Sequence, residues 1–126
     1  MKLLKCAVCG NVIEMIEDKK VPVMCCGQMM NELVANTSDG ASEKHVPVIE
    51  IKDDVLFVQV GSVEHPMLPE HFITKIFVEY GDNLSQASLT PGVKPVASFN
   101  LNGYKGLVTV YEFCNIHGLW KAEIEI

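Results

Sequence analysis

Four cysteines near the start of the chain constrain its fold more than any other feature. A CxxC motif at residues 6–9 is followed by Gly10, and an adjacent pair at residues 25–26 is followed by Gly27. A CxxC turn brings two thiolates to one ion, and the following glycine permits a tight turn that directs backbone N–H groups at sulfur. About 36 residues bury too little apolar surface to fold unaided, so we expect a metal ion to hold residues 1–36 together.

The chemistry of these four thiolates leaves the identity of the metal open. Four sulfur ligands suit tetrahedral zinc or iron, and a structural zinc knuckle is the usual role of such a set. Adjacent cysteines are less usual, because neighbouring side chains of an extended chain point in opposite directions. Both can bind one ion only through a distorted turn. Such a distortion points to a redox site more than to a structural site. The residues alone therefore favour neither metal.

The remainder of the chain reads as β-structure. Short apolar and β-branched runs recur between turn-forming residues, and the last run alternates apolar with charged side chains as a half-buried strand does. No segment has a helical period. The expected strands are Val46–Ile51, Val55–Val60, Phe72–Tyr80, Leu84–Thr90, Val96–Leu101, Leu107–Phe113 and Leu119–Ile126. Seven strands in about 85 residues indicate an antiparallel β-sandwich, and the small polar segment at residues 36–42 is expected to be a linker.

The charge and hydropathy of the chain limit its partners and its location. The formal net charge is −6, which disfavours nucleic acid and anionic membranes as partners. No apolar run approaches the ~20 residues of a membrane-spanning helix, and the N-terminal residues do not resemble a secretory signal. We therefore expect a cytoplasmic protein, whose five cysteines stay reduced and serve metal or redox chemistry rather than disulfides.

All four histidines and the fifth cysteine lie in the predicted sandwich: His45, His65, His71, His117 and Cys114. Loops and strand ends at one end of a sandwich converge in space. Several imidazoles with one thiolate suit a redox-active first-row metal, with iron as one candidate. The alternative is a scatter of exposed histidines and an inert buried cysteine.

The order of these motifs is similar to that of a known family. The segments CxxCG, CCG, SDGASEKHVPVIE, GSVEHPMLPEHFI and YEFCNIHGLWKAE together resemble desulfoferrodoxin, the two-iron superoxide reductase, over essentially the whole chain. The resemblance implies a mostly β protein: a small desulforedoxin- or rubredoxin-like metal-binding domain at residues 1–36, followed by an immunoglobulin-like antiparallel β-sandwich at residues 37–126, in a homodimer.

The resemblance also implies the site residues and two iron ions per chain. Cys6, Cys9, Cys25 and Cys26 would form the tetrathiolate centre. The second iron would have four equatorial histidines, His45, His65, His71 and His117, with Cys114 as axial ligand. His117 would bind through Nδ1 and the other three through Nε2. Glu43 and Lys44 would flank the open sixth position as catalytic residues, and backbone N–H groups of Ile116 and His117 would bond the axial sulfur.

The implied activity is one-electron reduction of superoxide to hydrogen peroxide, a detoxification reaction with an external electron donor such as rubredoxin. Two alternatives remain at this point. The first is an electron-transfer protein whose irons turn over no substrate, and an open coordination position argues against it. The second is a zinc-stabilised β-sandwich that serves as a binding module, which would be colourless when purified.

Overall fold

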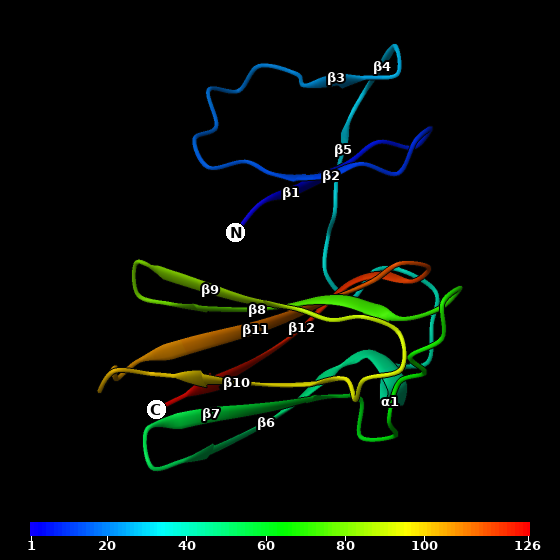
Figure 1. Cartoon of the computed structure of the whole chain (residues 1–126). Helices are drawn as coiled ribbons and strands as arrows, with labels where there is room; N and C mark the ends of the chain where they lie inside the picture. Colours follow the sequence, from blue (N-terminus) through cyan, green and yellow to red (C-terminus); the bar gives the residue numbers. More distant parts are fainter. The chain divides into compact units, whose positions relative to one another are not determined.

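The computed structural model describes residues 1–126, and the chain divides into two compact units, Met1–Val34 and Ala35–Ile126. Figure 1 shows that both units consist almost entirely of strands and loops. The one helix has four residues, whereas a membrane span needs about 20, so no helix of the structure could cross a bilayer.

The first unit is a pair of minimal sheets. Strands β1 (Leu3–Lys5), β2 (Val12–Glu14) and β5 (Asn31–Glu32) form an antiparallel sheet in the order β2-β1-β5, and β3 (Met24–Cys25) pairs with β4 (Gln28–Met29). Its buried core consists of Leu4, Cys6 and Met30. A core of this size does not stabilise a fold, and a metal centre is therefore the expected source of stability for this unit.

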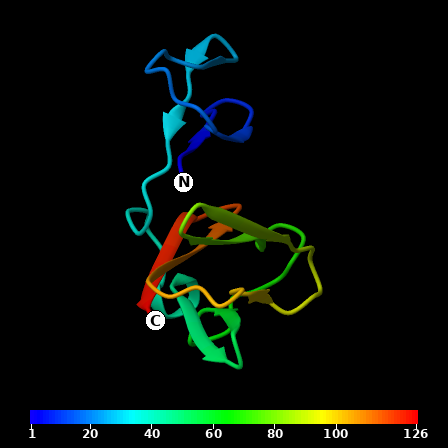
Figure 2. The same ribbon diagram turned by 90° about the vertical axis from the view of Figure 1, so that its left-hand side faces the viewer.

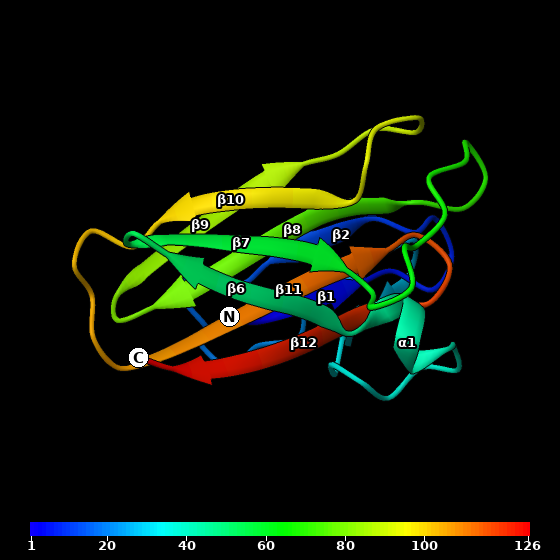
Figure 3. The same ribbon diagram turned by 90° about the horizontal axis from the view of Figure 1, so that it is seen from below.

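The second unit is an antiparallel β-sandwich, which confirms the predicted fold class. One sheet has the order β10-β7-β6 and the other β12-β11-β8-β9. Figures 2 and 3 show the two sheets as separate layers. The elements are α1 (Ser42–His45), β6 (Pro47–Lys52), β7 (Val55–Val60), β8 (Ile73–Tyr80), β9 (Asn83–Ser88), β10 (Val96–Asn100), β11 (Leu107–Cys114) and β12 (Gly118–Glu125).

The sandwich core lies between these sheets. Alternate residues of β7 are buried because successive side chains of a strand point to opposite faces. They meet inward-facing residues of the second sheet, and the fully buried apolar members include Leu56, Val60, Ile76, Val78, Val108 and Val110. Cys114 belongs to the same core cluster at the end of β11.

The seven predicted strands are all present, with ends that differ by at most two residues. Two local expectations were wrong. The sequence shows no helical period, yet Ser42–His45 form the single-turn helix α1, and β6 begins at Pro47 rather than at Val46. The expected linker is docked at its start, because Asn36 donates its backbone N–H to the Leu119 carbonyl (3.0 Å) and accepts the Lys121 N–H at its side-chain oxygen (2.9 Å). Asn36 therefore covers part of the exposed edge of β12.

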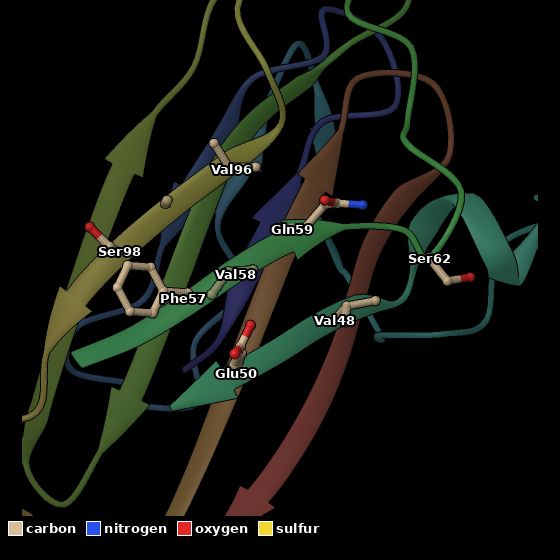
Figure 4. Close-up of a pocket in the computed structure, with 9 residues that line it drawn as sticks. Val48, Glu50, Phe57, Val58, Gln59, Ser62, Val96 and Ser98 are labelled. Atoms are coloured by element: carbon tan, nitrogen blue, oxygen red, sulfur yellow. The ribbon is translucent and has the colours of Figure 1, made fainter. Parts of the chain in front are cut away.

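One hollow of the second unit lies on the outer face of the β10-β7-β6 sheet. It has a volume of about 700 Å³, and its lining includes Val48, Phe57 and Val96. In Figure 4 these three side chains stand on three adjacent strands and face outward. No histidine or cysteine lines this hollow, so the chemistry of the chain lies elsewhere.

Candidate metal centres

The first unit brings its four cysteines together. One sulfur atom from each of Cys6, Cys9, Cys25 and Cys26 lies within 4.8 Å of the others. The Cys9 and Cys25 sulfurs are 3.6 Å apart. Two thiolates bound tetrahedrally at about 2.3 Å from one ion lie about 3.8 Å apart, so the spacing fits a tetrathiolate centre.

Local backbone geometry lets adjacent cysteines share this centre. Cys26 has φ of 52° and Gly27 has φ of 72°, which is the left-handed region that turns the chain sharply. In the CxxC turn, the N–H groups of Val8 and Cys9 donate to the Cys6 sulfur at 3.4 and 3.5 Å. The second cysteine pair thus contains the distorted turn that its sequence requires.

The same hydrogen bonds favour thiolate chemistry. Backbone donors, first from Cys9 and then from Val8, lower the pKa of the Cys6 thiol to about 6. The pKa of Cys25 is raised to about 12, chiefly because its thiol hydrogen-bonds Cys6. Without a cation, therefore, one ionised sulfur holds the proton of its neighbour in place. A bound metal ion is what would allow all four sulfurs to ionise.

The second unit gathers the four histidines and Cys114 at one end of the sandwich. Their ligand atoms lie within 4.8 Å of one another. His45 ends α1, His65 and His71 lie in the loop between β7 and β8, Cys114 ends β11, and His117 lies in the turn before β12. Segments distant in sequence thus supply one ligand set.

The spacing of these atoms fits a single ion. His45 Nε2 is 3.0 Å from His117 Nδ1 and 3.2 Å from His65 Nε2. Two nitrogens bound at about 2.1 Å and at right angles would lie about 3.0 Å apart. The Cys114 sulfur is 3.5 Å from His65 Nε2 and 3.9 Å from His117 Nδ1.

Burial keeps these imidazoles available as ligands. His45 and His65 are 2% and 1% exposed. Burial lowers the pKa of His65 to about 4 and also lowers the pKa of His45 and His71, so these rings are neutral near pH 7. His71 Nε2 is buried and has no hydrogen-bond partner. An orphaned buried nitrogen that faces a thiolate and other imidazoles is what a metal site requires.

Main-chain carbonyls orient two of the rings. His45 Nδ1 lies 2.8 Å from the Ala41 carbonyl oxygen, and His65 Nδ1 lies 2.7 Å from that of Pro66. When Nδ1–H is bonded to a carbonyl, the lone pair of Nε2 remains free to bind a metal. This is the usual arrangement around metal-bound histidines. The His117 N–H donates to the Cys114 sulfur (3.4 Å), which stabilises a thiolate there.

Trp120, the only tryptophan of the chain, supports the same ligands. Its indole N–H donates to the His117 carbonyl (3.0 Å), and its ring stacks on His45 with a centroid distance of 4.9 Å. Gly40 packs closely against both rings, because a Cβ there would lie 3.2 Å from both His45 Cε1 and Trp120 Cζ2. Sequence reasoning missed Trp120, Gly40 and Ala41, although a single tryptophan three residues after a candidate ligand was an available signal.

Glu43, Lys44 and Ile116 are exposed residues that adjoin His45 and His117 in sequence. Glu43 and Lys44 belong to α1 and are exposed, and the Glu43 carbonyl accepts the Val63 N–H at 2.9 Å, which ties α1 to the loop that follows β7. Burial and the charge of His117 lower the pKa of His71 most; the charge of Glu70 raises it, and that of Lys44 lowers it slightly. Ile116 is 55% exposed.

The fold and the two ligand sets define a class: a two-unit β protein that pairs a tetrathiolate site with a histidine–thiolate site. The family model described as Desulfoferrodoxin matches residues 37–123. The chain is 45% identical to a desulfoferrodoxin of Syntrophotalea carbinolica over 98% of its length and 96% of the relative, and 47% identical to one of Clostridium acetobutylicum over 91% and 90%. The chain belongs to the desulfoferrodoxin family.

A solved structure agrees with this assignment over both units. The superoxide reductase of Treponema pallidum matches with a TM-score of 0.74 and 30% identity, over 94% of this chain and 98% of that one. The likeness therefore includes the small N-terminal unit and not only the sandwich.

Proposed function

We propose that this chain is a superoxide reductase, which converts superoxide, one electron and two protons to hydrogen peroxide without forming dioxygen. The observation that carries the proposal is the convergence of four histidines and one cysteine at the end of the sandwich. Membership of the desulfoferrodoxin family and the similarity to the Treponema pallidum superoxide reductase support it.

Family membership and the two ligand groups make this an iron-binding protein. That each chain holds two irons is our proposal. Residues 1–36 would hold one iron through Cys6, Cys9, Cys25 and Cys26, and residues 37–126 would hold the other through His45, His65, His71, His117 and Cys114. The disjoint ligand sets and their different softness support this division.

When bound, the second iron would supply the electron that reduces superoxide. Metal-bound imidazoles are neutral and Cys114 adds one negative charge, so the ligand set leaves a divalent ion with net positive charge. Exposed Lys44 adds a cation on the approach. This local field would attract a small anion to a chain whose net charge is −6.

The remaining steps depend on groups around the ligands. The His117 N–H, together with that of Ile116 in our proposal, withdraws electron density from the Cys114 sulfur and so tunes the site. Protons come from water at the exposed side, ordered by Lys44. Glu43, one residue before Lys44 on α1, is the carboxylate that would serve as a further ligand of this iron.

We further infer a small redox protein such as rubredoxin as the electron donor, a cytoplasmic location, and a homodimer. The first unit exposes apolar side chains that a dimer interface would cover, including Ile16 at 88% and Val21 at 67% exposed. The donor follows from the family resemblance, and the location from the five cysteines, which are all free as in a reducing compartment.

The test is the stoichiometry of superoxide consumption by the reduced protein, with metal analysis of the same sample. We expect about one peroxide per superoxide with no dioxygen evolved, and close to two irons per chain. Dioxygen evolution would indicate a dismutase instead. Coloured iron that cycles with a donor but consumes no superoxide would support the electron-transfer alternative, and colourless zinc protein would support the binding module.

A further inference from the structure

Asn115 lies in the turn between Cys114 and His117, and it hydrogen-bonds the main chain on both sides of His71. Its side-chain oxygen accepts the Phe72 N–H at 2.9 Å, and its side-chain nitrogen donates to the Glu70 carbonyl at 3.1 Å. Its own backbone N–H donates to the Phe72 carbonyl at 3.2 Å. Three hydrogen bonds from one residue thus hold the main chain immediately before and after His71.

The position of His71 depends on its main chain more than those of His45 and His65 do. The rings of His45 and His65 are oriented by carbonyl groups bonded to Nδ1, whereas His71 Nε2 has no hydrogen-bond partner and no carbonyl is bonded to its ring. Within its own loop, His71 is held through a bridge to Leu68, with two backbone hydrogen bonds of 3.0 Å. That bridge is local, so it does not fix the distance from His71 to the Cys114 turn.

We propose that Asn115 is a positioning residue that fixes His71 within the ligand set by joining its loop to the turn between Cys114 and His117. The inference rests on the proposed function in taking the cluster as a metal site. It adds that one amide side chain sets how firmly the metal is held. Groups that orient metal ligands are typically worth 10- to 100-fold in metal affinity or activity.

Asn36 provides a matched control. Its side-chain oxygen also accepts a backbone N–H, from Lys121 at 2.9 Å, and its side-chain nitrogen also donates to a backbone carbonyl, that of Lys121 at 3.4 Å. Replacement by Asp at either position keeps the acceptor, loses the donor and adds one negative charge. Only Asn115 bonds the residues that flank a ligand.

The experiment compares Asn115→Ala, Asn115→Asp and Asn36→Asp with wild type as full-length, iron-loaded proteins. Each is incubated with EDTA, and visible spectroscopy follows the long-wavelength band of ferric histidine–thiolate iron and the red tetrathiolate bands. We expect Asn115→Ala to lose the long-wavelength band about 10- to 100-fold faster than wild type, with Asn115→Asp between them. Asn36→Asp should behave as wild type, and the tetrathiolate bands should persist at the wild-type rate in all four proteins.

Equal rates of loss in wild type and both Asn115 variants would overturn the positioning role. An equally faster loss in Asn36→Asp would also overturn it, because the effect would then be general loosening of the sandwich. If Asn115→Ala does not fold, Asn115→Asp against Asn36→Asp still decides the question. A wild-type protein that holds iron at the histidines but consumes no superoxide would refute the proposed function, while the rates of iron loss to the chelator would still decide the role of Asn115.

Discussion

Glu112 is a carboxyl group buried in the core of the sandwich. It is 0% exposed, it shares the inner face of β11 with Val110 and Cys114, and its cross-strand neighbours are Ile76 and Trp120. Neither side-chain oxygen has a hydrogen-bond partner. Burial raises the pKa of Glu112 from 4.5 to about 9, because an unpaired charge is costly in an apolar interior.

The raised pKa makes folding stability depend on pH. Between pH 4.5 and about 9 the folded protein keeps a proton on Glu112 that the unfolded chain releases. The contribution of this proton to the stability of the folded protein is therefore fully present below about pH 4.5, and it is lost as the pH rises toward 9. The slope is about 1.4 kcal/mol per pH unit, which gives at most about 4 kcal/mol between pH 5 and 8.

The variant Glu112→Gln isolates this effect, because an amide stays neutral at every pH in the range. We expect its free energy of unfolding, relative to wild type, to increase steadily from pH 5 to 8. The buried amide adds a constant penalty for its own unpaired groups. The test is therefore how the difference in free energy of unfolding changes with pH, and not its size at any one pH.

The assay is denaturant unfolding at several pH values, followed by the fluorescence of Trp120 at matched metal content. Glu50→Gln, at an exposed position of β6, is the control and should differ from wild type by no more than about 0.5 kcal/mol at each pH. Parallel pH profiles for wild type and Glu112→Gln would refute the reasoning, since they would show that Glu112 does not retain its proton in the folded protein.

Four further substitutions test the division of labour between the two centres. Cys114→Ser should abolish superoxide reduction and leave the tetrathiolate spectrum intact; a bleached tetrathiolate with activity preserved would contradict the assignment. Cys9→Ser should remove the first metal and destabilise residues 1–36, with superoxide reduction largely retained in the same assay. Lys44→Ala should slow the second-order reaction about tenfold and weaken its dependence on ionic strength in pulse radiolysis; equal salt slopes would exclude steering. Glu43→Ala should change the ferric spectrum without slowing the first step, and a slowed first step would show that its role differs.

The sequence by itself determined the fold class and the chemistry of the candidate ligands. Alternation along a strand is a local property, so runs such as Val55–Val60 could be recognised without knowledge of their partners. Cysteine and histidine are scarce and chemically distinctive, so Cys114 and His117 can be recognised as candidate metal ligands from the sequence alone. The CxxC motif likewise contains its own turn.

Only the tertiary structure decided how those ligands are held. The carbonyls of Ala41 and Pro66 orient His45 and His65, and a carbonyl has no residue-specific signature in a sequence. Small polar residues favour loops whether or not the loop is docked, and for that reason the sequence predicts a linker where Asn36 is in fact bonded to β12. Asn115 reaches residues 43 and 45 positions away in sequence, and such pairings exist only after β8 and β11 have paired in one sheet and brought the end of one strand beside the start of the other.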